Sequence, residues 1–171
     1  PLLWPLGLPT ASSPAAMRFR AAIDSLPEHA VVLLACDIDP ASRPELEPML
    51  RTTLHQLWSR HARVVVVSVV PGGAALADHV LEDVVAESRA HGRVLERGVD
   101  YLDLGYRPGG EAVMTLLARD VQAAFPIDHH GEPSSQAPIL RGIEGASGFA
   151  LLVSLSTGAP GAREWMQQVA T

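Results

Sequence analysis

Four apolar runs alternate with segments of helical periodicity along this chain, and this alternation restricts the fold more than any other feature. The run at residues 30–36 is continuous and the run at 63–70 is rich in β-branched residues, which is typical of strands buried on both faces of a parallel sheet. Two further runs follow at 99–105 and 149–156. The pattern predicts an α/β fold: a doubly wound, three-layer sandwich of the Rossmann or flavodoxin-like type, with a mainly parallel sheet of about four strands. We expect a strand order such as 2-1-3-4.

The domain organisation follows from length and local composition. The 171 residues suit a single domain, which we place at 14–171, behind an apolar, proline-rich extended lead-in at 1–13. Residues 126–147 are rich in proline and glycine and are expected to form an irregular loop, of a length that often serves as a lid or a binding element. The uncharged opening and the helical ending predict that the chain is a piece of a longer protein.

Composition argues against several classes of protein. The chain has 13 basic and 19 acidic residues, a formal charge of −6 and no basic stripe, so nucleic acid is not an expected partner. The single Cys36 allows neither a disulfide framework nor a cysteine zinc site. Neither the G-x-G-x-x-G fingerprint nor a P-loop sequence is present, so no cofactor is expected. No segment is predicted to span a membrane.

The polar segments that follow the predicted strands are the candidate binding site. In doubly wound folds, ligands bind outside the carboxyl ends of the strands. Carboxylates follow the first strand, a ring and a guanidinium follow the third with a glycine pair behind them, and hydroxyls follow the fourth. Such groups suit a small anionic or polar molecule. The predicted ligand-binding residues are Asp37, Asp39, Tyr106, Arg107, Gly109, Gly110, Ser154, Ser156 and Thr157.

The same glycines also have a purely architectural interpretation. Three Pro-Gly-small tripeptides, at 71–73, 108–110 and 160–162, each stand before a helical segment. Proline is favoured in the first turn of a helix and glycine permits a tight turn from strand to helix, so these turns are explained without a ligand. No arrangement of nucleophile and base is recognisable, and no catalytic residue is predicted.

The tripeptide Asp128-His129-His130 points to an alternative. It resembles the sequence that names the DHH phosphoesterases, a family whose carboxylates and histidine bind manganese, and the resemblance implies a metal-dependent hydrolase. The matching positions are Asp37, Asp39, Asp103, Asp128, His129 and His130. The sequence departs from that family in two ways: Pro126 and a helical segment precede the tripeptide, and "DIDPAS" lacks the Ala-x-Gly-Ser continuation.

A second resemblance covers essentially the whole chain. The ordered pieces "PLGLPTASSP", "ACDIDPASRPELEPM", "VVPGGAALA", "DYLDLGYRPGGEAV" and "LSTGAPGAREWMQQV" resemble an uncharacterised family of prokaryotic membrane-associated proteins. In that family a soluble α/β domain is set between predicted membrane helices, and no activity or catalytic residue is established. The resemblance implies a membrane-associated location through segments absent from this chain, with the side of the membrane left open.

These observations favour a binding, sensing or assembly module over an enzyme. The metal-dependent phosphoesterase of DHH type is the alternative function. Self-association is a further expectation, because the apolar segment "PLLWPLGLP" is suited to pack on the domain or on a partner, with Trp4 as its anchor.

Overall fold

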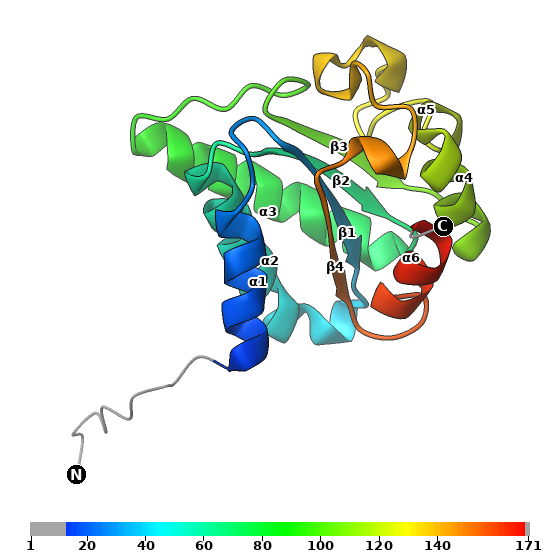
Figure 1. Ribbon diagram of the computed structural model, residues 1–171, viewed down its shortest axis with the longest axis horizontal. Helices are drawn as coiled ribbons and strands as arrows, with labels where there is room; N and C mark the ends of the chain where they lie inside the picture. The colour runs from blue at the N-terminus through cyan, green and yellow to red at the C-terminus, as the bar shows by residue number, and fades with distance from the viewer. Residues whose placement is uncertain (1–12, 170–171) are drawn as a thin grey trace.

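The computed structural model describes residues 13–169. Helices and strands alternate along the chain as the sequence pattern predicts (Figure 1). The strands are β1 (Val31–Asp37), β2 (Arg63–Ser68), β3 (Tyr101–Tyr106) and β4 (Leu151–Ser156). The α-helices are α1 (Pro14–Asp24), α2 (Arg43–Ser59), α3 (Pro71–Ala90), α4 (Glu111–Arg119), α5 (Val121–Ala124) and α6 (Ala162–Val169). Short 3₁₀ turns are η1 (Pro40–Ser42), η2 (Ser134–Gln136), η3 (Pro138–Leu140) and η4 (Ala146–Gly148).

The four strands form one parallel sheet in the order β3-β2-β1-β4, so the α/β class is confirmed. The expected order 2-1-3-4 is wrong, because β4 rather than β3 is the second neighbour of β1. The burial of the individual strands agrees with this strand order. The residues of β1 are all buried, and those of β2 are buried except the first, so these two strands occupy the centre of the sheet. The more exposed β4 forms an edge.

Helices cover both faces of the sheet and enclose two apolar cores (Figure 1). On one face α1, α2 and α3 pack against the sheet, and this core includes Leu34, Cys36, Leu54, Leu57, Trp58, Val66, Val80 and Val84. On the other face lie α4, α5 and α6, with a core that includes Leu33, Ala35, Leu102, Leu104, Met114, Leu117, Phe125 and Trp165. Burial raises the pKa of the Cys36 thiol to about 12, so this side chain behaves as a buried apolar group.

The loop at 126–147 runs along the free edge of β3. The His129 N–H donates to the carbonyl of Asp103 at 2.9 Å, and the Ile139 N–H donates to the carbonyl of Gly98 at 2.8 Å. Ile139, Leu140 and Ile143 are buried in the second core. An open strand edge exposes unpaired backbone groups, and this loop covers them. The expected irregular segment is thus a packed part of the domain.

The glycine at the third position of α3, in the Pro-Gly-Gly sequence that opens this helix, is required by close packing. A Cβ atom on Gly73 would lie 1.8 Å from the carbonyl oxygen of Cys36, which leaves no room for any side chain. In the second turn, Gly109 and Gly110 have φ values of 132° and 52°, which favour glycine. Both turns are therefore explained by the backbone, as the architectural interpretation holds.

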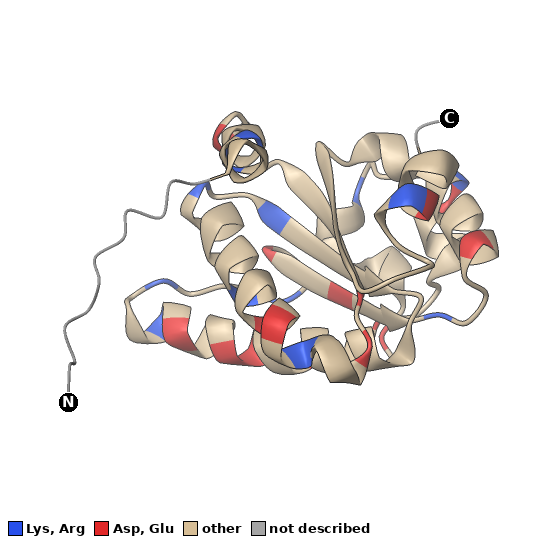
Figure 2. Ribbon diagram, turned by 90° about the horizontal axis from the view of Figure 1, so that it is seen from below, with Lys and Arg blue, Asp and Glu red and all other residues tan. Residues whose placement is uncertain are grey.

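Basic residues are spread singly over the described ribbon and form no continuous stripe (Figure 2). Within residues 13–169, none of the helices is both long enough and apolar enough to cross a bilayer. The expected lead-in, with Trp4, falls almost entirely on residues 1–12 and so lies outside the described part of the chain.

Candidate functional site

The strand order divides the predicted ligand-binding residues into two groups. Asp37, Asp39 and Thr157 lie where β1 and β4 end, whereas Tyr106 and Arg107 lie at the end of β3. Because β3 and β4 are opposite edges, three interstrand spacings separate them, or about 14 Å. The two groups therefore lie at opposite sides of the end of the sheet where the strands terminate.

The polar atoms of Asp37, in the group at β1 and β4, form hydrogen bonds within the protein. Asp37 accepts from the indole N–H of Trp165 at 2.6 Å and from the Val69 N–H at 2.8 Å. Desolvation raises the pKa of Asp37, and these donors oppose that rise. The topological switch point lies between β1 and β4, where such folds often bind ligands, but here its central carboxylate is buried beneath α6.

Asp39 and Thr157 form a second structural contact at the same point. The Asp39 N–H donates to Thr157 Oγ1 at 3.1 Å, and the Asp39 carboxylate caps η1 by accepting from the Ala41 N–H at 2.8 Å. Hydrogen bonding to Thr157, and then to Ala41, lowers the pKa of Asp39. Ser154 Oγ is buried without a partner among the described atoms, and Ser156 sits against Gly161. The contact between Asp39 and Thr157 connects the segments that follow β1 and β4.

The group at β3 lines a cavity of about 260 Å³. Its polar lining comes from Tyr106, Arg107, Asp128 and His129. Its other lining residues are Leu104, Gly105, Phe125 and Ile127. The tyrosine is about 40% exposed, so its ring is accessible from solvent. Gly109 and Gly110 are not among the residues that line this cavity.

The six residues of the metal alternative do not come together. Along β3, Leu102 and Leu104 belong to the core under α4, so Asp103 points to the opposite face, which α3 covers. Asp37 points to the face of α6 and bonds Trp165. The two carboxylates that the DHH resemblance pairs are therefore on opposite faces of the sheet.

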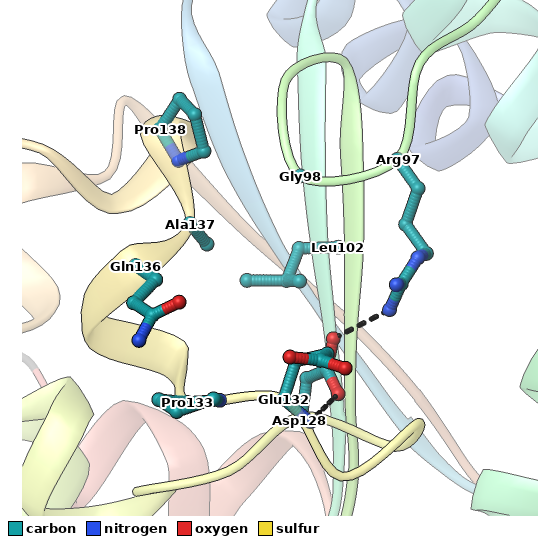
Figure 3. Close-up of a pocket in the computed structure, with 9 residues that line it drawn as sticks. All are labelled: Arg97, Gly98, Leu102, Asp128, Glu132, Pro133, Gln136, Ala137 and Pro138. Carbon is teal, nitrogen blue, oxygen red and sulfur yellow. Dashed lines mark hydrogen bonds and ion pairs between the residues drawn. The ribbon is translucent and has the colours of Figure 1, made fainter.

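Asp128 is engaged in a local network of its own. Arg97 donates to Asp128 Oδ2 at 2.7 Å, and the Glu132 N–H donates to Oδ1 at 2.9 Å. The His130 N–H donates to the same Oδ1. Figure 3 shows this ion pair at the rim of a smaller pocket of about 160 Å³, with Pro133 and Gln136 on its other wall. The carboxylate closes the turn that places His129 beside β3.

A different cluster forms on the α3 face of β3. Asp78, Asp103 and His129 each offer one ligand atom, and these atoms lie within 4.8 Å of one another. His129 Nε2 is 3.7 Å from Asp78 Oδ2. Desolvation raises the pKa of Asp103 to about 6, while the Gly105 N–H and the charge of His129 oppose the rise. Asp78 is absent from the sequence-based prediction, because it lies within the helical segment of α3 and not after a strand.

No protein-family model, no curated protein and no solved structure matches this chain. Fold and site together therefore define its class: a three-layer α/β domain with polar side chains gathered at the end of an edge strand.

Proposed function

We propose that this chain is a binding module that holds a small anionic molecule at the end of β3. The observation that supports it is the shared cavity of Tyr106, Arg107 and His129. The Arg107 N–H donates to the carbonyl of Ser68 at 3.0 Å, so the backbone that carries the guanidinium is anchored to β2. Among residues 13–169, the Arg107 side chain has no ion-pair partner. A guanidinium in this state suits a carboxylate or a phosphate.

Size and lining narrow the class of ligand. Cavities for drug-sized molecules span roughly 300–1,000 Å³, and this one, at about 260 Å³, is smaller. Leu104, Phe125 and Ile127 give it apolar lining beside the polar groups. The preferred ligand is accordingly a small carboxylic acid or phosphate ester with a short apolar part. No catalytic step belongs to this proposal.

The proposal also includes a membrane-associated setting. Its support is the resemblance of the "GYRPGGE" and "PGAREW" segments to proteins in which such a domain stands between membrane helices. In that setting, ligand binding at Arg107 would be sensed or used in assembly next to a membrane.

The test is a thermal-shift screen of small carboxylates and phosphates against the wild-type chain and two variants. Arg107→Ala removes the proposed anion contact. Arg60→Ala is the matched control, because Arg60 caps α2 at the opposite end of the sheet. We expect at least one anion to raise the Tm of the wild type and of Arg60→Ala, and to leave Arg107→Ala unchanged. Equal stabilisation of all three proteins, or of none, would overturn the proposal.

A further inference from the structure

We infer that Asp78, Asp103 and His129 form a binding site for one divalent transition-metal cation, such as Zn²⁺ or Mn²⁺. The three side chains come from α3, from β3 and from the loop that covers the β3 edge. Two carboxylates and one imidazole are a donor set that such ions accept. This site is separate from the proposed anion contact at Arg107, although His129 takes part in both.

The backbone holds the imidazole in place. The His129 N–H donates to the carbonyl of Asp103, and this hydrogen bond fixes the loop beside β3, the strand that carries Asp103. Gly105 lies under the imidazole with a φ of 74°, and a Cβ atom there would be 3.0 Å from His129 Nδ1. Any other residue at position 105 would press on the ring. The other nitrogen, Nε2, is the one that lies near Asp78.

An unpaired buried oxygen is the independent observation that points to a ligand. Asp103 is only 4% exposed, and its Oδ1 accepts from the Gly105 N–H at 2.8 Å. Its Oδ2 is buried and has no hydrogen-bond partner among the described residues. Buried polar atoms are almost always paired, and an unpaired carboxylate oxygen is costly. A cation coordinated by this oxygen supplies the missing partner.

The ligand atoms of Asp78, Asp103 and His129 would have to move only slightly closer together to bind one cation. Ligand atoms bind such cations at about 2.0–2.2 Å, so two ligands of one ion are at most about 4.4 Å apart. The observed limit of 4.8 Å is slightly larger. The side chains of His129 and Asp78 are 35% and 30% exposed, so neither is enclosed by packing on all sides. Their exposure also leaves open coordination positions on the solvent side.

The neighbouring charges favour a cation here. Asp78 and Asp128 both act on Asp103 in the direction that raises its pKa, so negative charge accumulates around the buried carboxylate. Arg97 offsets the charge of Asp128 through their ion pair. Within residues 13–169, His129 is the only basic residue that pairs with a carboxylate of the cluster, and as a metal ligand it would be neutral.

The experiment measures Zn²⁺ and Mn²⁺ binding to the metal-free chain at pH 7 by isothermal titration calorimetry. Bound Mn²⁺ is also followed by electron paramagnetic resonance, which reports coordination directly. We compare the wild type with Asp78→Asn, Asp103→Asn and His129→Gln. His130→Gln is the matched control, because it alters the adjacent histidine outside the cluster. Arg107→Ala separates this site from the proposed anion contact.

We expect one ion per chain in the wild type, in His130→Gln and in Arg107→Ala. Each change within the cluster should weaken binding by more than about tenfold. Asp78→Asn is the decisive variant, because Asp78 is partly exposed and its change leaves the core intact. The inference is overturned if the wild type binds neither ion, or if Asp78→Asn binds as tightly as the wild type. Metal binding that persists while no anion stabilises the chain would reject the proposed function alone.

Discussion

The indole N–H of Trp165 in α6 donates to Asp37 Oδ2 at the end of β1, at 2.6 Å and across 128 positions of sequence. Both side chains are buried. Asp37 Oδ1 also accepts from the Val69 N–H, so the carboxylate connects β1, the end of β2 and α6. Asp37, at the switch point of the sheet, thus connects α6 to the sheet through a hydrogen bond.

Trp165→Phe should lower the free energy of unfolding by more than ring volume alone would explain. The substitution keeps an aromatic ring but leaves Asp37 Oδ2 buried without its donor, which costs about 1–3 kcal/mol. Urea denaturation followed by far-UV circular dichroism measures the difference.

Trp58→Phe is the matched control for that measurement. Trp58 is equally buried, but its indole nitrogen has no hydrogen-bond partner among the described residues. The same change there removes ring atoms without breaking a bond. A Trp165→Phe effect no larger than that of Trp58→Phe would show that the bond to Asp37 contributes nothing to stability.

The α/β class was predictable because it depends on local patterns. Continuous apolar runs and helical periodicity are read directly from the residues, and the four strands lie where those runs are. Strand order depends on which strands become neighbours. β1 is buried throughout and β2 is buried apart from its first residue, which corresponds to the apolar runs in their sequences and indicates central positions. Nothing in the sequence pattern alone places β4 beside β1.

The candidate site was predictable only in part. Tyr106 and Arg107 stand at the carboxyl end of a strand, and the sequence pattern places them at the end of the sheet where their cavity lies. Their separation from Thr157 follows from strand order and could not be predicted without it. Asp78 lies within a helical segment, and its contact with His129 arises because the loop covers the β3 edge. Such a contact leaves no local pattern in the sequence.

Asp103 should make stability fall as pH rises through the weakly acidic range. Burial raises its pKa from 3.8 to about 6 in the folded protein. The folded state then holds the proton more tightly than the unfolded state, so protonation stabilises the fold. This contribution is complete below about pH 3.8 and is lost as pH approaches 6. In the wild type, the free energy of unfolding should therefore decrease by up to about 1.4 kcal/mol per pH unit between about pH 3.8 and 6. Asp103→Asn should not show this decrease.

Urea denaturation at several pH values, with a chelator present, measures this difference between the wild type and Asp103→Asn. Asp24→Asn, at the exposed end of α1, is the control and should parallel the wild type. Parallel curves for the wild type and Asp103→Asn would contradict the raised pKa. In a separate measurement without chelator, added Zn²⁺ should stabilise the wild type at pH 7, where Asp103 is mostly deprotonated, and should have little effect on Asp103→Asn.

The loop at 126–147 should behave in stability measurements as part of the core. Ile139 is 1% exposed and packs in the second core, and its N–H bonds the carbonyl of Gly98. Ile139→Ala should lower the free energy of unfolding by about 2–5 kcal/mol, because it leaves a cavity beside β3. Ile127→Ala is the control within the same loop, since Ile127 is 54% exposed and should change stability far less. Hydrogen exchange tests the same point locally: the Ile139 amide should be protected as strongly as strand amides. Rapid exchange there, with a stability change no larger than that of Ile127→Ala, would show that the loop opens independently of the sheet.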